Sequence, residues 1–214
     1  DRRAFIPATR KEGAWDRAYL HTTAGVCLID GDRLLFPYCG YSGQAPDGSR
    51  GMYTGASIGL ATLRRDGFAS MDAGEKGGTL TTRPVTFSGR HLFVNVACPQ
   101  GELRAEALDA DGKPIEPFTA KNCTPVSADK TLQRLAWSGA DDLSALAGKP
   151  MRLRFRLTNG SLYAFWVSPS EKGESRGYLA AGSLGQPGII DDPRAPSAGS
   201  RVSPTHDARP ATRE

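Results

Sequence analysis

Glycine and proline residues divide this chain into short apolar runs, and this spacing limits the folds that the chain can adopt. The 214 residues include 25 glycines and 15 prolines. The runs between them are rich in Val, Leu, Phe and Thr, which favour strands, whereas Gly and Pro favour turns. Apolar residues make up 39% of the chain, which is enough for a buried core. The sequence therefore predicts an all-β protein of one or two globular domains.

The distribution of charge bears on the partners of the chain. The net charge is +4, but the 27 basic and 23 acidic residues are interspersed, which is typical of a solvated surface. No apolar run approaches the roughly 20 residues of a membrane-spanning helix. We therefore expect neither nucleic acid nor a membrane as a partner. Residue 1 is Asp and no leader pattern follows, which predicts a processed or truncated product, and the localisation stays open between secreted, periplasmic and other compartments.

The four cysteines, Cys27, Cys39, Cys98 and Cys123, give no metal-binding pattern. Their spacing matches neither a CxxC pair nor a Cys/His zinc site, and the three histidines are scattered. We expect no metal and no cofactor. Two interpretations of the cysteines stay open, namely disulfides (Cys27 with Cys39, Cys98 with Cys123) or free thiols buried in strands.

Residues 1–66 are expected to form one sheet. A connecting segment precedes a hairpin of residues 26–29 and 34–36, with Gly31 and Asp32 as its turn. A long polar loop then returns into a strand within residues 55–72, which joins the first unit to the second. Three strands with one long loop are typical of a single β-propeller blade. Such a unit cannot bury both faces, so its apolar residues would need further blades or the following domain.

Residues 67–169 show turn signals at short intervals, which predict a two-sheet antiparallel β-sandwich of the jelly-roll kind. Its expected strands are residues 79–82, 85–87, 91–97, 102–108, 115–118, 132–137, 151–157 and 162–167. Its expected core residues are Leu92, Val94, Leu103, Trp137, Leu153, Phe155 and Trp166. Residues 170–214 have few apolar anchors and are expected to be a flexible or disordered tail.

The last expected hairpin turns at Asn159 and Gly160, a strong type I′ signal. This turn predicts that the two flanking strands pair, with Leu157 opposite Leu162. Arg156 would then lie beside Tyr163, Arg154 beside Phe165 and Arg152 beside Val167 on the outer face. That face either stacks on sugars, or packs against the first unit, or is an ordinary half-solvated strand face.

Three sequence runs carry a family resemblance. GLATLRRDGFASMD (59–72), GGTLTTRPVTFSGRHLFVNV (77–96) and LTNGSLYAFWV (157–167) resemble the end of bacterial glycoside hydrolases of the family 32 and family 43 kind. Those proteins have a five-bladed β-propeller followed by a β-sandwich. The resemblance implies that residues 1–66 are the last blade, and that the upstream blades of the same protein are partners of this chain.

The resemblance also implies where a sugar would bind. Glycosidases of this kind need paired carboxylates on early blades, and none of the matching motifs occurs here, so we nominate no catalytic residue. Asp66, in an Arg-Asp-Gly run, is expected to be a turn residue. A Gly-x-Trp-Asp stretch opens the final blade in such proteins, which makes Trp15, Asp16 and the nearby His21 the candidate substrate-binding residues. The alternative is that Trp15 fills a core position and Asp16 caps a turn.

The expected function is therefore the C-terminal part of an enzyme that hydrolyses O-glycosidic bonds of a saccharide. The sandwich would be an accessory module, and the chain alone would not catalyse. The alternative from another class is a non-catalytic module that binds carbohydrate or has a structural or interaction role.

Overall fold

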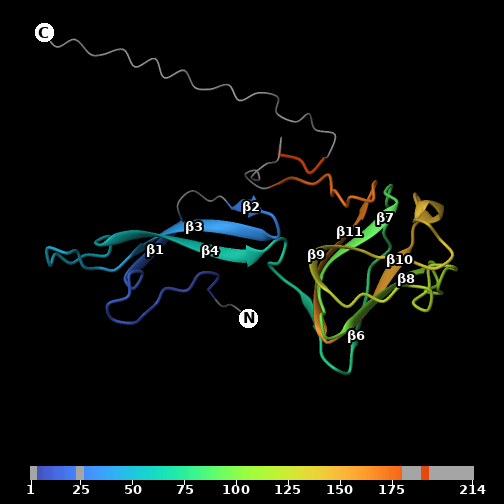
Figure 1. Cartoon of the computed structure of the whole chain (residues 1–214), viewed down its shortest axis with the longest axis horizontal. Coiled ribbons are helices and arrows are strands. Elements are labelled where there is room, and N and C mark those ends of the chain that lie inside the picture. Colours follow the sequence, from blue (N-terminus) through green and yellow to red (C-terminus); the bar gives the residue numbers. More distant parts are fainter. Residues whose placement is uncertain (1–3, 23–26, 180–188, 193–214) are drawn as a thin grey trace, which may run out of the picture.

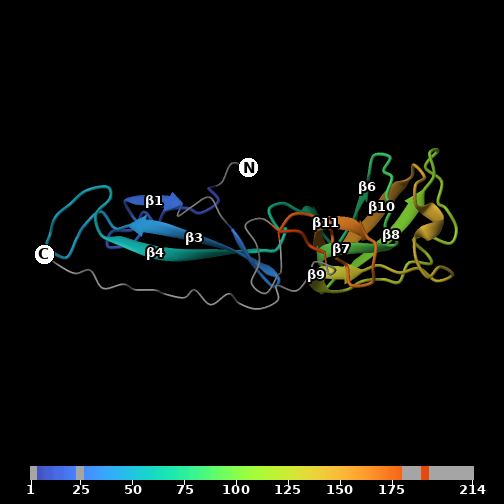
Figure 2. The same cartoon turned by 90° about the horizontal axis from the view of Figure 1, so that it is seen from above.

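The protein is all-β, with antiparallel sheets in two units (Figure 1). The computed structural model describes residues 4–22, 27–179 and 189–192. These residues contain eleven strands and one short 3₁₀ helix, η1 (Ser144–Leu146). No helix among them has the length and apolar character needed to cross a membrane. The view from above shows the two units side by side along the long axis of the molecule (Figure 2).

The first sheet is built around one long strand. It comprises β1 (Tyr19–Thr22), β2 (Leu28–Asp30), β3 (Arg33–Tyr41) and β4 (Ala56–Arg64). Strand β3 pairs with β4 along its whole length, while β1 and β2 pair with opposite ends of its other edge. The predicted turn is confirmed, because Asp30 pairs with Arg33 across Gly31, whose φ is 55°. Pro37 pairs with Leu60 of β4.

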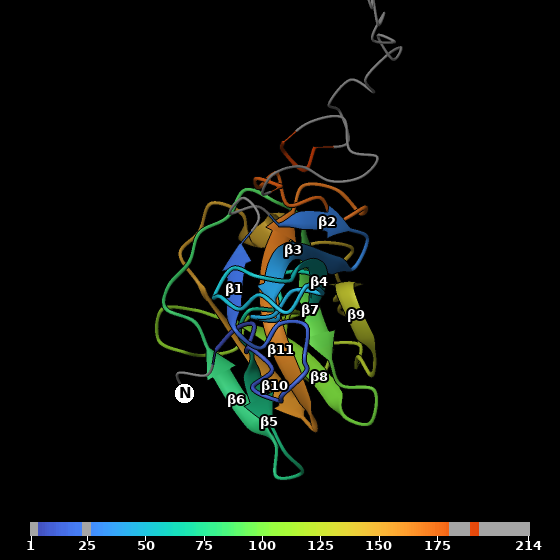
Figure 3. The ribbon, with the colours of Figure 1, turned by 90° about the vertical axis from the view of Figure 1, so that its left-hand side faces the viewer.

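The second unit consists of two sheets that share one core. One sheet has the order β6 (Gly78–Thr81), β10 (Arg152–Thr158), β8 (Glu102–Leu108). The other has the order β5 (Met71–Ala73), β11 (Gly160–Ser168), β7 (His91–Ala97), β9 (Asp129–Arg134). Figure 3 looks at this unit with the first sheet in front of it. Of the expected strands, residues 85–87 contribute one isolated bridge from Val85 to Met151, and residues 115–118 form no strand.

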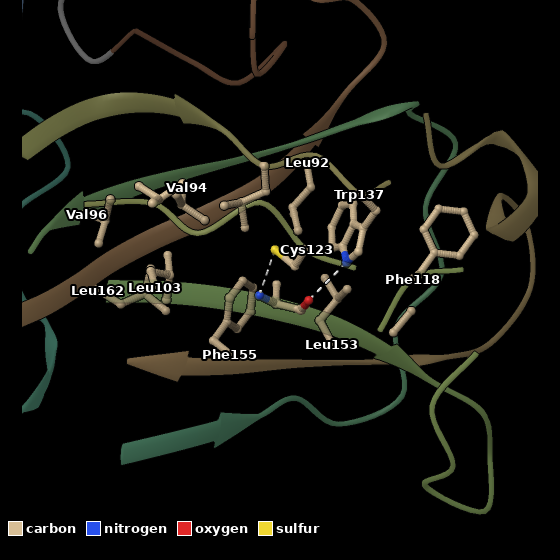
Figure 4. Packing of buried hydrophobic residues seen from close by; sticks show 14 of the residues in the cluster. Leu92, Val94, Val96, Leu103, Phe118, Cys123, Trp137, Leu153, Phe155 and Leu162 are labelled. Carbon is tan, nitrogen blue, oxygen red and sulfur yellow. Dashed lines mark hydrogen bonds between the residues drawn. The ribbon is translucent and has the colours of Figure 1, made fainter. Parts of the chain in front are cut away.

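Six of the seven predicted core residues are confirmed. Leu92, Val94, Leu103, Trp137, Leu153 and Phe155 are all buried in one cluster between the two sheets (Figure 4). Inside it, the Trp137 indole N–H donates to the carbonyl of Ala105 at 3.0 Å, and the Ala105 N–H donates to the Cys123 sulfur at 3.3 Å. The polar atoms of this core are therefore paired as burial requires.

The predicted hairpin at Asn159 and Gly160 is wrong. Strand β10 pairs with β6 and β8, whereas β11 pairs with β5 and β7, so the turn carries the chain from one sheet to the other. Asn159 has the left-handed conformation that the sequence suggested, with φ of 44°. A tight turn signal predicts the local backbone conformation but not the sheet to which the next strand belongs. Strands β10 and β11 lie in different sheets, and both can direct apolar side chains into the shared core from opposite sides.

Trp166 is the core residue that was predicted wrongly. The pairing of β11 with β7 shifts between Leu162 and Ala164, which marks a β-bulge. A bulge inserts one residue and exchanges the faces of the residues that follow it. Leu162 is buried before the bulge, and Phe165 and Val167 pack against the core after it. Trp166 therefore faces outward, where its ring stacks on Phe93 with centroids 5.8 Å apart.

Arg64, at the end of β4, joins the two units. Its Nε donates to the side-chain oxygen of Asn95 at 2.6 Å, and its guanidinium also donates to the carbonyl of Val96 at 3.0 Å and to the carboxylate of Asp129. The Tyr163 ring lies 4.8 Å from the guanidinium carbon. Asn95 in turn donates to the backbone carbonyl of Arg65 at 2.6 Å. We name this set of contacts the Arg64 clamp.

A segment of the predicted flexible tail differs from the expectation. Leu179 is buried against Ile29 and Leu34 of the first sheet, and its N–H donates to the carbonyl of Ile189 at 2.8 Å. The segment after β11, drawn in orange, runs from the second unit toward β2 (Figure 1). Leu179 therefore anchors this segment on the first sheet, although the composition of the segment did not indicate an anchor. The remainder of the predicted tail, 180–188 and 193–214, lies outside the described residues.

We predict that Arg64→Met lowers the free energy of unfolding by about 2 kcal/mol, because the buried Asn95 loses a charged donor. Chemical denaturation followed by tryptophan fluorescence measures the change. The matched control is Arg33→Met, whose ion pair with Asp30 is exposed, so its change should stay within about 0.5 kcal/mol. Equal stability of the two variants would show that the clamp contributes nothing.

Candidate functional site

Trp15 lies flat over one face of the first sheet. Its ring lies where side chains at Gly40 and Gly59 would be, since a Cβ atom at either position would come within 2.5 Å of it. Its centroid is 5.6 Å from that of Tyr38 on the same face. Because the two glycines have no side chain, the indole can pack directly against the backbone of the sheet. Trp15 keeps 39% of its surface exposed, so it is available both as packing and as a stacking surface.

Asp16 is buried beside Trp15, with only 4% of its surface exposed. Its Oδ2 accepts hydrogen bonds from the Thr9 N–H at 3.3 Å and from the Thr9 hydroxyl at 3.0 Å. Its Oδ1 is buried and has no hydrogen-bond partner among the described residues. A buried carboxylate oxygen without a donor is costly, so it marks a place where a further donor would fit. Asp16 also has a local structural role, because its two hydrogen bonds hold Thr9 in place.

His21 does not join Trp15 and Asp16. It is paired with Cys39, and Cys39 with Ile58, so these three side chains share one face of the sheet. Tyr38 and Gly40 precede and follow Cys39, and therefore present the opposite face, on which Trp15 lies. Tyr41 also lies on the His21 side, with its ring centroid 6.2 Å from that of Tyr19. The structure thus brings together two of the three nominated residues.

The face that carries His21 is apolar and no described segment covers it, and we name it the open face. Ile58 is 80% exposed and Leu60 is 59% exposed, although both lie in the middle of β4. Leu28 of β2 is also exposed on this face, opposite Leu35 of β3. The second edge of β4 has no strand partner among the described residues. The other face is covered by residues 4–18, through Trp15 on Tyr38 and Phe5 on Phe36 at 5.0 Å.

A cavity of about 410 Å³ lies where the two units meet. The turns of the first sheet contribute Asp32, Arg65 and Asp66 to it, and the second unit contributes Trp166. Asp66 is in the left-handed conformation, with φ of 51°, and Gly67 donates to Arg64, so Asp66 occupies the predicted turn.

The segment after β11 forms the rest of the cavity wall, which sequence analysis missed. It contributes Lys172, Glu174 and Ser175, together with Asp191 from residues 189–192. Glu174 is only 8% exposed, and its Oε2 accepts a hydrogen bond from the Ser170 hydroxyl. The composition of this region indicated a tail, and no periodic pattern marks Glu174 as buried, so the sequence carried no signal for this site.

The outer face of β10 differs from the sugar-stacking face that the hairpin suggested. Arg154 and Arg156 both donate to Oε1 of the buried Glu106, at 3.3 Å for Arg154 Nη1 and 2.8 Å for Arg156 Nη2. The aromatic side chains expected beside them lie on β11, in the other sheet. The arginines thus compensate a buried carboxylate, which is costly without them.

The cysteines are all free thiols, and two of them, Cys98 and Cys123, are buried. Burial raises the pKa of the Cys123 thiol, which keeps it protonated and unreactive. The interpretation as free buried thiols is thus confirmed for this pair. Among the described residues, no group of three or more His, Cys, Asp or Glu is arranged to hold a metal ion.

The environment of His91, at the start of β7, changes the pKa of its imidazole. Burial lowers its pKa below the usual 6.5, and the positive charge of Arg134 lowers it further. Its Nδ1 is buried and unpaired among the described residues. The fold therefore favours the neutral imidazole.

We predict that His91 makes the protein less stable as the pH falls below about 6.5. The unfolded chain binds a proton on His91 at a higher pH than the folded chain does, so stability is complete above that pH and decreases toward the lower folded pKa. Thermal unfolding between pH 8 and pH 5 should show a smaller decrease for His91→Gln than for the parent protein. The exposed His21→Gln is the control and should retain the parental slope; an unchanged slope for His91→Gln would contradict the prediction.

Comparison with known proteins gives no relative for this chain. No family model, no curated protein and no solved structure matches it.

Proposed function

We propose that this chain is the C-terminal part of a β-propeller glycoside hydrolase, in which the first sheet is the last blade and the second unit is a jelly-roll-like β-sandwich. The observation that carries the proposal is the open face. Propeller blades pack face to face, so a blade without its neighbour leaves one apolar face uncovered. Ile58 and Leu60 supply such a face.

Within this proposal, Trp15 and Asp16 contribute to saccharide binding. An indole can stack on the apolar face of a sugar ring, and the free Oδ1 of Asp16 can accept a hydroxyl once neighbouring blades shape a pocket around it. Hydrolysis also needs a proton donor and a second carboxylate at a fixed separation across the bond. Those groups would come from upstream blades.

A non-catalytic role in carbohydrate binding or interaction is the second candidate. The second unit favours it, because its core is complete without a contribution from the first sheet. Residues 67–169 alone would then fold and bind saccharide. In the hydrolase proposal they fold but bind none.

The activity test compares the 214-residue chain with the complete product of its gene on aryl glycosides and fructans. We predict turnover by the complete product and none by the chain, because the chain offers Asp16 alone in a sugar-binding position. Asp16→Ala in the complete product should lower kcat/KM by about tenfold or more, as expected for the loss of a charged hydrogen bond. Turnover by the isolated chain would overturn the proposal, and unchanged kinetics for Asp16→Ala would remove that residue from the site.

A separate prediction tests the open face in the complete product. Ile58→Lys should lower the free energy of unfolding there by about 2 kcal/mol or more, because a neighbouring blade would bury the new charge. The same change should have little effect in the 214-residue chain, where Ile58 is 80% exposed. Tyr178→Lys, at a side chain that is 82% exposed, is the control in both proteins. Equal tolerance of Ile58→Lys in both would mean that nothing covers the open face.

A further inference from the structure

Glu174 is a buried residue whose carboxylate has no positively charged partner among the described residues. The Ser170 hydroxyl donates a hydrogen bond to its Oε2. An ionised carboxylate that is more than nine-tenths buried needs a compensating charge, as Glu106 obtains from two arginines. For Glu174, the space in which such a charge could lie is the cavity that it lines.

The other charges around this cavity also leave it acidic. Its wall contains four carboxylates, Asp32, Asp66, Glu174 and Asp191, against the two cations Arg65 and Lys172. Arg65 is paired with Asp66, at 3.9 Å between Nε and Oδ2. Asp32 and Asp191 are held by neutral donors, from Thr131 and from the Ser175 N–H at 2.7 Å. Lys172 alone therefore faces three carboxylates that have no ion pair among the described residues.

The uncharged part of the wall suits an organic cation. Trp166 lines the cavity, and its N–H is already donated to the carbonyl of Gly173 at 2.9 Å, so its remaining contribution is the π surface. Aromatic rings attract ammonium groups, most strongly in places shielded from water. The carboxylates do not converge on one point as metal ligands would. The volume of about 410 Å³ is within the range of sites for small organic ligands, roughly 300–1,000 Å³.

We propose that this cavity binds a small organic ammonium ion, a primary amine on an aliphatic skeleton, with Glu174 as its counter-ion and Trp166 as its apolar wall. The site is distinct from Trp15 and Asp16, and the proposal does not rest on the proposed hydrolase function. It gives the segment after β11 a role in binding, since that segment contributes Glu174 and Lys172.

The test compares two ligands of matched size, diaminobutane and butanediol, on the 214-residue chain by calorimetry and tryptophan fluorescence. We expect the diamine to bind and the diol not to bind at the same concentrations, with affinity decreasing as salt is added. Equal binding of both ligands would show a site for hydroxyl groups or general apolar contact and would overturn the proposal. Absence of diamine binding up to millimolar concentration would also overturn it.

Three variants locate the site. Glu174→Gln, which keeps the shape and removes the charge, should weaken diamine binding by about tenfold or more. Glu171→Gln is the control on the same segment, because Glu171 is exposed and paired with Arg134; its affinity should stay within about twofold. Lys172→Gln removes the competing cation and should strengthen binding, a result that misfolding cannot produce. Parental affinity in Glu174→Gln or weaker binding in Lys172→Gln would contradict the assignment.

Discussion

The guanidinium of Arg64 is the contact on which the placement of the two units depends. It lies at the last residue of β4 and reaches a side chain, a carboxylate and a backbone carbonyl of the second unit. Asn95 returns a hydrogen bond to the next residue of the joint, so the chain is held at two successive positions. A flexible joint would let the turns at Asp32 and Asp66 move away from β9 and Trp166. The clamp and the hydrogen bond from the Thr131 hydroxyl to Asp32 together hold these turns at the cavity.

The β-bulge in β11 explains why part of the second unit was predictable from the sequence and part was not. Alternation predicted strands β7 and β8 with their observed bounds, and it predicted the inward residues of β10. Alternation assumes an unbroken period of two, which holds only while no residue is inserted. The pairing of β11 with β7 shifts between Leu162 and Ala164, which exchanges the faces of the residues after the shift, whereas Asn95 lies on the face opposite to Val94 and Val96 by ordinary alternation. Bulges leave little signal in one sequence, so Trp166 was assigned to the wrong face.

The candidate site was predictable only where neighbours in sequence are neighbours in space. Trp15 and Asp16 are adjacent, and the turn that follows them needs no distant contact to bring them together. His21 is close in sequence but belongs to a strand, whose register with Cys39 sends it to the other face. Glu174 lies beyond the last expected strand, and it shares its cavity with Asp32 and Asp66, which are far away in the sequence. Such long-range contacts cannot be read from local composition.

The open face links the sequence pattern to the proposed function more directly than any single residue does. Strand β4 places Ile58, Leu60 and Thr62 on one face and Gly59, Ala61 and Leu63 on the other. Trp15 covers the face that carries Gly59, whereas Ile58 and Leu60 are on the face that the described residues leave uncovered. A sheet face that contacts water normally carries polar side chains. A long apolar strand with an unpaired edge can pair with the strands of other chains and aggregate. Exposed apolar residues on the open face are therefore expected if another sheet covers this face in the functional protein. For this reason we propose that a neighbouring blade packs against it.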